Sequence, residues 1–182
     1  MKKRWISLHV ENEPGVLARI CGLFSGKSYN LDSLTVGPTE DETVSRMTIG
    51  LTGDDRTFEQ IKKQLARSVE VIKVVDLTET AMYCRELMLV RIHDCSRDDI
   101  SQLFEMAAVF HAAVIDYSPS SVLLQSVQTE EDNSLLLNRL KLRFPNRVYA
   151  VRGGSVAICL LYTSRNRNRH LLPLLRRSHA PA

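Results

Sequence analysis

The sequence predicts an α+β protein made of two consecutive units, each with a four-stranded antiparallel sheet that carries two helices on one face. Three observations predict this class. Stretches of alternating apolar residues, typical of half-buried strands, are separated by stretches with apolar residues at helical spacing. In residues 1–78 their order is βαββαβ, which is the order of a ferredoxin-like domain. The same order returns over residues 86–157, so we expect two domains of about eighty residues each.

The first domain begins with a strand over residues 5–10, in which Ile6, Leu8 and Val10 share one face. Trp5 lies on the opposite face, which the helices are not expected to cover. A helix follows, and its apolar residues recur at helical spacing: Val16, Leu17, Ile20, Leu23 and Phe24.

Gly26 is expected to end this helix, because glycine is common just after the last helical turn. Two strands over residues 31–36 and 44–51 then form a hairpin around the turn residues 37–41. An Asp-Asp pair at residues 54–55 caps the second helix. The apolar face of that helix consists of Phe58, Ile61 and Leu65.

The fourth strand, residues 70–77, is rich in valine and isoleucine on both of its faces. Val71 and Val75 are expected on one face, and Ile72 and Val74 on the other. Helices cover only one face of the predicted sheet, so an edge strand that is apolar on both faces favours pairing across a subunit boundary. The sequence therefore predicts an oligomer.

A connector over residues 79–85 leads to the second domain, residues 86–157. Its strands are expected over residues 87–92, 113–117, 121–127 and 147–151. Ser96 and Asp99 form a capping-box pattern at its first helix, and acidic residues 130–132 favour the start of its last helix. The apolar residues of these helices are Ile100, Leu103, Phe104 and Ala107, then Leu136, Leu140 and Phe144.

The composition is that of an ordinary globular protein, with 182 residues, 44% of them hydrophobic and 25% charged. The formal net charge is +3, but residues 159–182 hold five arginines and no acidic residue. Subtracting that +5 from +3 leaves −2 for the remaining residues. Residues 158–182 show no convincing period, and we expect them to be a basic tail that is disordered or the product of a shifted reading frame.

No motif in the sequence indicates a catalytic site or a metal centre. The four cysteines show neither CxxC spacing nor a histidine partner, and the five histidines lie in no catalytic pattern. Nucleotide-binding glycine motifs and the nucleophile elbow are absent from the sequence. No catalytic and no metal-ligating residue is therefore predicted. Residues 156–162, the longest apolar run, are too few to span a bilayer, and the cysteines favour a reduced, cytoplasmic location.

The turn over residues 11–17 is the clearest candidate for a binding site, because it closes a strand and opens a helix. The free N–H groups and positive dipole end of a helix start suit a small carboxylate. Pro14 fits the first helical turn, where its missing N–H costs nothing, and Gly15 lets a ligand approach the backbone. The same residues also fit a well-formed helix start that binds nothing, so both interpretations stay open.

The chain resembles the regulatory (small) subunit of acetolactate synthase, also called acetohydroxyacid synthase, which begins with an amino-acid-binding ACT domain. The segments that carry the resemblance are residues 10–19, 22–25, 29–36 and 45–49. Among them, Asn-Leu-Asp-Ser-Leu-Thr at 30–35 and Ser-Arg-Met-Thr-Ile at 45–49 are close to that family's own sequence. Residues 85–90 resemble the start of its second domain, and the resemblance covers residues 1–157.

This resemblance implies a binding site for the feedback inhibitor valine between two ACT domains that pair side by side. Six residues match the family's ligand turn and the facing position from the partner chain: Asn12, Gly15, Val16 and Leu17, then Asn30 and Leu31. The helix-start amides would hold the carboxylate, the two asparagine oxygens would accept from the ammonium group, and the two leucines would select a short branched side chain.

The resemblance further implies a non-catalytic homodimer that activates a separate catalytic large subunit in the biosynthesis of valine, isoleucine and leucine. Valine would be its effector and would inhibit the activated enzyme. Thiamine diphosphate, Mg²⁺ and FAD are implied on the large subunit, with no cofactor on this chain. Neither a nucleic acid nor a membrane is implied as a partner.

Two other functions remain open from the sequence. One is a free-standing tandem-ACT regulator of gene expression that reaches nucleic acid through its arginine-rich tail, although no helix-turn-helix is visible. The other is a small enzyme with its own ACT sensor, for which the length leaves little room. The tail also departs from the family, whose chains usually end soon after the second domain: residues 151–157 fit the family pattern and residues 159–182 do not.

Overall fold

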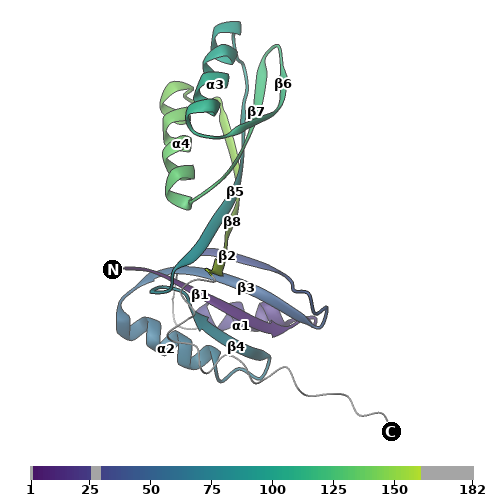
Figure 1. Ribbon diagram of the computed structural model, residues 1–182, viewed down its shortest axis with the longest axis vertical. Helices are drawn as coiled ribbons and strands as arrows, with labels where there is room; N and C mark the ends of the chain where they lie inside the picture. Colours follow the sequence, from purple (N-terminus) through teal and green to yellow (C-terminus); the bar gives the residue numbers. More distant parts are fainter. Residues whose placement is uncertain (1, 26–29, 161–182) are drawn as a thin grey trace.

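The computed structural model of the chain describes residues 2–25 and 30–160, which form two antiparallel sheets (Figure 1). The first sheet has the strand order β2-β3-β1-β4. Its elements are β1 (Lys2–Glu11), α1 (Val16–Ser25), β2 (Leu31–Pro38), β3 (Val44–Gly53), α2 (Asp55–Leu65) and β4 (Val71–Asp76).

The second sheet has the equivalent order, β6-β7-β5-β8. Its elements are β5 (Met82–Ile92), α3 (Arg97–Val109), β6 (Ala113–Ser118), β7 (Ser121–Gln128), α4 (Glu130–Arg143) and β8 (Val148–Cys159). Two consecutive βαββαβ units, each with a four-stranded antiparallel sheet, are therefore confirmed.

Each domain encloses its own core between the sheet and its two helices. Phe58, Ile61 and Leu65 of α2 are buried in the first core, as their spacing predicts. In the second domain Phe104 is the exception: it is 42% exposed, and its ring lies nearly perpendicular to the Tyr117 ring, with the two ring centres 5.6 Å apart. The helical pattern placed Phe104 in the core, but it lies at the rim where β6 ends.

The helix starts follow the local signals in the sequence. Asp54 accepts a 2.7 Å hydrogen bond from the Thr57 N–H, and Ser96 and Asp99 form a complete capping box. The Thr129 hydroxyl accepts from the N–H of Asp132, the third residue of α4. Gly26, the expected end of α1, lies outside the described residues.

The side chains of β4 do not alternate as predicted. Val71 and Val74 both pack against the first core, Val75 lies on the opposite face, and Ile72 is exposed. The register between β1 and β4 shifts beside His9. Because of this irregularity, Val71 and Val74 lie on the same face although three positions separate them.

β5 and β8 are both longer than the sequence patterns indicate. Residues 82–85, expected in the connector, pair with residues 156–159 at the far end of β8, so that Met82 lies opposite Cys159. Only residues 77–81 separate β4 from β5. The expected tail began at residue 158, but β8 continues to Cys159, and residues 161–182 lie outside the described part of the chain.

The extended ends of β5 and β8 form a two-stranded ribbon that runs from the second sheet to the first (Figure 1). There Ala157 packs with Trp5 and Leu77 in a third apolar cluster. Trp5 was expected to face an uncovered side, but this ribbon covers it and leaves it 9% exposed. Gly50 makes room for the indole, since a Cβ at that position would lie 2.8 Å from the Trp5 ring.

Candidate functional site

The turn between β1 and α1 has a backbone that requires glycine. Gly15 has a φ of +86°, a conformation that residues with a side chain rarely adopt. A Cβ at Gly15 would also lie 3.0 Å from Nη1 of Arg19, one turn further along α1. The turn therefore brings the backbone and the Arg19 guanidinium together at the start of the helix.

A cavity of about 310 Å³ lies beside this turn. Its lining comes from the β1–α1 turn on one side and the β2–β3 hairpin on the other: Val10, Glu11, Asn12, Glu13, Val16, Leu17, Val36, Gly37, Pro38, Ser45 and Met47. Three of the predicted site residues, Asn12, Val16 and Leu17, therefore share one cavity. Gly15 shapes the turn without lining the cavity wall.

Hydrogen bonds fix the Asn12 side chain in one orientation. Its Nδ2 donates to the Glu42 carbonyl at 2.8 Å, and its Oδ1 accepts from the Ser45 hydroxyl at 2.9 Å. A carbonyl oxygen only accepts, so the amide nitrogen must be the atom that faces Glu42. Oδ1 keeps a second lone pair that can accept from a further donor. The backbone N–H of Asn12 donates to the Thr43 carbonyl at 2.7 Å, which holds the whole residue in place.

The charges around the cavity suit a zwitterion. Glu11 and Glu13 are among its lining residues, whereas the start of α1 contributes the positive end of a helix dipole. Arg19 pairs with Glu70 at 2.5 Å between Nε and Oε1. The hydroxyl of Ser68 lowers the pKa of the Glu70 carboxyl most, then the backbone N–H of Glu70 itself, and Arg19 lowers it less. The remaining lining is mostly apolar, as in pockets for small ligands.

Asn30 and Leu31 lie away from this cavity within the chain. Leu31 pairs with Leu51 at the start of β2 and packs against the first core, and Asn30 is exposed just before it. The cavity is lined by Val36 and Pro38, at the other end of the same strand. A strand rises about 3.3 Å per residue, which separates Leu31 from Pro38 by roughly 23 Å.

Sequence reasoning missed the wall formed by the β2–β3 hairpin. Val36, Gly37 and Pro38 had been assigned to a strand end and a turn, and Ser45 to a strand. The available signal was the hairpin pattern itself, which brings residue 38 opposite Ser45. No local pattern shows that this end of the hairpin meets the β1–α1 turn, because that contact depends on the strand order.

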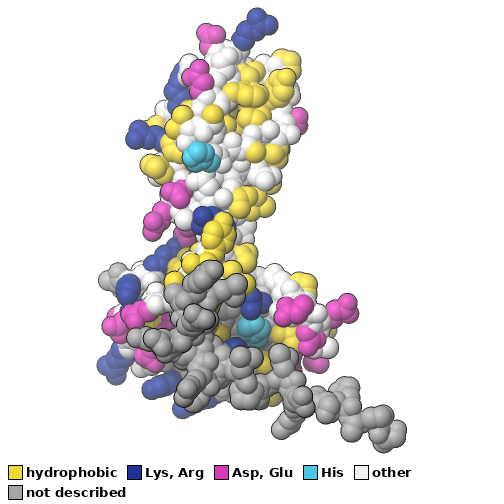
Figure 2. Space-filling view, in the orientation of Figure 1, with side chains coloured by type: hydrophobic (Ala, Val, Ile, Leu, Met, Phe, Trp, Pro, Cys, Tyr) yellow, Lys and Arg dark blue, Asp and Glu magenta, His cyan; other side chains and the backbone are white. Residues whose placement is uncertain are grey.

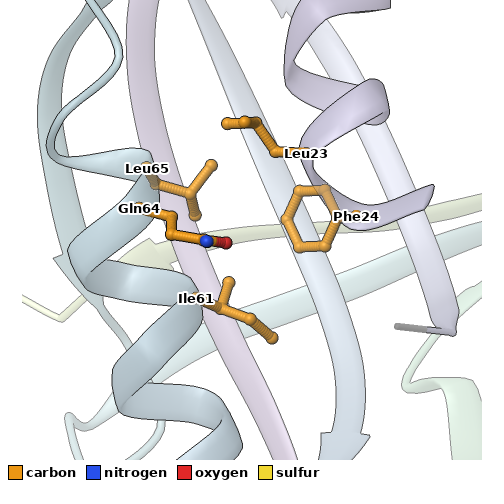
Figure 3. Close-up of a pocket in the computed structure, with 5 residues that line it drawn as sticks. All are labelled: Leu23, Phe24, Ile61, Gln64 and Leu65. Carbon is orange, nitrogen blue, oxygen red and sulfur yellow. The ribbon is translucent and has the colours of Figure 1, made fainter. Parts of the chain in front are cut away.

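Two other hollows lie elsewhere in the described part of the chain. Figure 3 shows side chains of α1 and α2 that point toward one another, among them Phe24 and Gln64. This crevice belongs to the packing between the two helices. A larger hollow of about 420 Å³ lies between β4 and the end of β8, with Arg46 and Lys73 in its wall. Among the described residues no group of three metal-ligating side chains is found, and no helix is long and apolar enough to cross a membrane.

Comparison with known proteins gives matches over both domains. Residues 6–73 match the family described as "AHAS small subunit-like ACT domain", and residues 85–159 match "Small subunit of acetolactate synthase". The acetolactate synthase small subunit of Haemophilus influenzae is 41% identical over 141 residues, which is 76% of this chain and 85% of that protein. The isozyme 3 small subunit of Escherichia coli is 43% identical over 129 residues, or 70% and 77% of the two chains.

A solved structure shares the fold of both domains. The crystal structure of the acetolactate synthase small subunit from Thermotoga maritima superposes with a TM-score of 0.78 at 30% identity. The match covers 88% of this chain and 98% of that one.

Proposed function

The chain belongs to the family of acetolactate synthase small subunits, and from this premise we propose that it activates a catalytic large subunit and makes it sensitive to valine. The observation that carries the proposal is the cavity beside the β1–α1 turn. It combines a fixed Asn12 acceptor, a helix start and an apolar wall. These are the three features that a free α-amino acid with an aliphatic side chain needs.

The charges and the apolar wall of the cavity favour one orientation for a bound valine. Its carboxylate would lie at the N–H groups that open α1, where the helix dipole favours negative charge. Its ammonium group would donate to Asn12 Oδ1, close to the carboxylates of Glu11 and Glu13. Its isopropyl group would contact Val16 and Leu17. Because one methylene changes binding by only about 1–3 kcal/mol, leucine and isoleucine should bind more weakly rather than be excluded.

A homodimer would complete the site with Asn30 and Leu31 of a second copy. β2 is an edge strand of the first sheet, and within residues 2–25 and 30–160 no strand pairs with its outer edge, so that edge can pair with another strand. If two β2 strands pair antiparallel around a two-fold axis, the start of one lies beside the end of the other. Leu31 of one copy would then lie near Pro38 of its partner and thus at the cavity wall.

The catalytic chemistry would reside on the large subunit, with thiamine diphosphate, Mg²⁺ and FAD bound there. This chain would contribute a coupling free energy between the valine site and that subunit. Typical allosteric couplings of about 1–3 kcal/mol change an affinity fivefold to more than a hundredfold, which is sufficient for feedback control.

Mixing the chain with its matched large subunit tests the proposal. We expect acetolactate formation to rise severalfold on addition of this chain, and valine to lower it again. The large subunit alone, with and without valine, is the control. No activation by a folded sample, or activation that valine leaves unchanged, would contradict the proposal.

A further inference from the structure

We propose that Ser33 and Thr35 of β2 transmit the effector signal to the second domain, because their side chains hold the Gly154–Ser155 segment of β8. This inference rests on the proposed function and names the route by which the valine site acts. The segment lies where the β5–β8 ribbon crosses the first sheet. It joins the strand that carries the effector site to the domain that follows.

Two hydrogen bonds make the connection. The Thr35 hydroxyl donates to the Ser155 carbonyl at 2.9 Å, and the Ser155 N–H donates to the Ser33 hydroxyl at 3.0 Å. Ser155 is 1% exposed, so water cannot readily replace either bond. Because both backbone groups of one residue are held, a displacement of β2 must move Ser155 or break a buried hydrogen bond.

The backbone at this contact is a bulge with no spare room. Glu86 lies opposite Ser155 and Met88 lies opposite Arg152, so Gly153 and Gly154 of β8 oppose the single residue Leu87, and β8 has one extra residue. Gly154 has a φ of +76°. A Cβ there would lie 2.9 Å from Cγ2 of Thr35 and 3.4 Å from the Leu34 carbonyl oxygen. The bulge therefore packs directly on β2, and a close-packed contact transmits small shifts.

On the other side of the bulge, Arg152 ties β8 to the interior of the second domain. Its Nε and Nη2 donate to the two oxygens of Glu86 at 2.9 and 2.6 Å. Asn133 of α4 also donates to the Glu86 carboxylate, at 3.1 Å, and Glu86 is 4% exposed. A buried charge held by several donors strongly prefers one arrangement. A displacement of the bulge therefore alters the contacts of α4, because Arg152 of β8 and Asn133 of α4 bind the same carboxylate.

On the near side, both ends of β2 belong to the proposed valine site. Leu31, two residues before Ser33, would face the cavity of the partner copy, and Val36, directly after Thr35, lines the cavity of its own copy. Ser33 and Thr35 therefore lie between two occupied ends of one strand. If valine binds more tightly when β2 is in one position, it stabilises that position and, through the two hydrogen bonds, the matching position of the bulge.

The double variant Ser33→Ala/Thr35→Val tests this route, since it removes both hydroxyls and changes side-chain volume little. Thr52→Val is the matched control, because Thr52 also donates a side-chain hydrogen bond from the first sheet, to Asp32, at 2.7 Å. We expect the double variant to activate the large subunit and to bind valine within about threefold of the wild type. The factor by which valine lowers the activity should be at least about tenfold smaller in the double variant than in the wild type. The control should be inhibited normally.

A second readout uses the reciprocity of coupled binding. If valine changes the affinity of the wild type for the large subunit by some factor, the large subunit must change its affinity for valine by that same factor. In the double variant that change should vanish. Thr35→Ser, which keeps the hydroxyl but lacks Cγ2, should retain both coupling and inhibition. If the double variant fails to fold, Thr35→Val alone serves as the test, because it removes the donor to the Ser155 carbonyl and should weaken both.

The outcomes separate the two proposals. A wild type that binds valine and is inhibited, together with a double variant inhibited to the same degree, overturns the route alone. A loss of valine binding in the double variant also overturns it, because Ser33 and Thr35 would then belong to the site. A wild type that valine neither binds nor inhibits overturns the proposed function and, with it, this inference.

Discussion

Substitutions at Gly15 can separate the effect of an added charge on valine binding from the effect of an added side chain. Asn and Asp both tolerate a positive φ better than other residues with a side chain, and they have nearly the same volume. A carboxylate about 5 Å from that of valine would cost about 3 kcal/mol at an effective dielectric constant of about 20. We therefore expect Gly15→Asp to weaken valine binding a hundredfold or more, measured by calorimetry, and Gly15→Asn far less. Equal losses in the two variants would place the carboxylate elsewhere.

His9 should make the stability of the first sheet depend on pH. Burial, then Arg46 and Lys73 on the neighbouring strands, lowers the pKa of the imidazole below its usual 6.5. Its Nε2 lies 3.0 Å from an Arg46 nitrogen. Below pH 6.5 the unfolded chain binds a proton that the folded chain resists, so stability falls as the pH drops from about 7 toward the lowered pKa.

We expect the melting temperature of the wild type to fall between pH 7 and pH 5.5, and the melting temperature of His9→Gln to fall less over the same interval. An unchanged slope in His9→Gln would show that other groups control the acid sensitivity.

At the level of the elements, β8 is anchored by a charged pair whose loss should be costly. Arg152 holds Glu86, which is almost fully buried, with two hydrogen bonds. Removing one partner of a buried pair typically costs about 3–5 kcal/mol, because the other charge stays buried. Arg152→Met should therefore lower the free energy of unfolding by about 3 kcal/mol, measured by urea denaturation.

The exposed pair of Lys2 and Glu79 provides the comparison, with side chains 60% and 77% exposed. Lys2→Met should cost less than about 1 kcal/mol, as exposed ion pairs usually do. If both variants lose the same stability, the Glu86 carboxylate is not held as the structure indicates.

The elements that local signals define could be predicted from the sequence. Asp54, Ser96 and Thr129 each start a helix through a bond to the residue three positions further on, so a pattern search finds them. The ribbon could not be found in this way. Its strand character depends on Ala157 meeting Trp5, and these residues lie far apart in the sequence. The bulge beside His9 likewise changes which valines of β4 face the core, and alternation alone cannot reveal a bulge.

Local sequence signals likewise predict one part of the candidate site and not the other. Asn12 and Gly15 stand out because a strand end, a proline, a glycine and a helix start follow one another within a few residues. Val36 and Ser45 join them only because β3 lies between β1 and β2 in the sheet. The role of Asn30 stays a prediction, since its exposed position within one chain fits a site only if a second copy supplies the rest.

At the scale of the whole molecule, the chain keeps surfaces open for other molecules. The ribbon covers part of the outer face of the first sheet, and hydrophobic side chains gather where the two domains meet (Figure 2). The outer face of the second sheet is also apolar, with Leu87, Val127 and Val151 each about half exposed. Exposed apolar faces of this kind are typical of proteins that work in an assembly.

A mixing experiment decides whether two chains share each valine site. Asn12→Ala and Asn30→Ala should each lose valine binding on their own. In a dimer of one chain of each type, one site contains both altered residues and the other contains neither. An equilibrated equal mixture should therefore recover about a quarter of the wild-type sites in a calorimetric titration, since half of its dimers are mixed and each has one intact site.

The matched control mixes two variants altered in the same turn, Asn12→Ala and Gly15→Asp. Every mixed dimer then has a defective turn in both sites, so no binding should return. Recovery in this control would mean that one site takes Asn12 from one chain and Gly15 from the other, which would contradict a single β1–α1 turn per site. Normal binding by Asn30→Ala alone, or no recovery when its freely exchanging chains are mixed with Asn12→Ala, would remove Asn30 from the site. The pairing of two β2 edges would then lose the reason for which it is proposed.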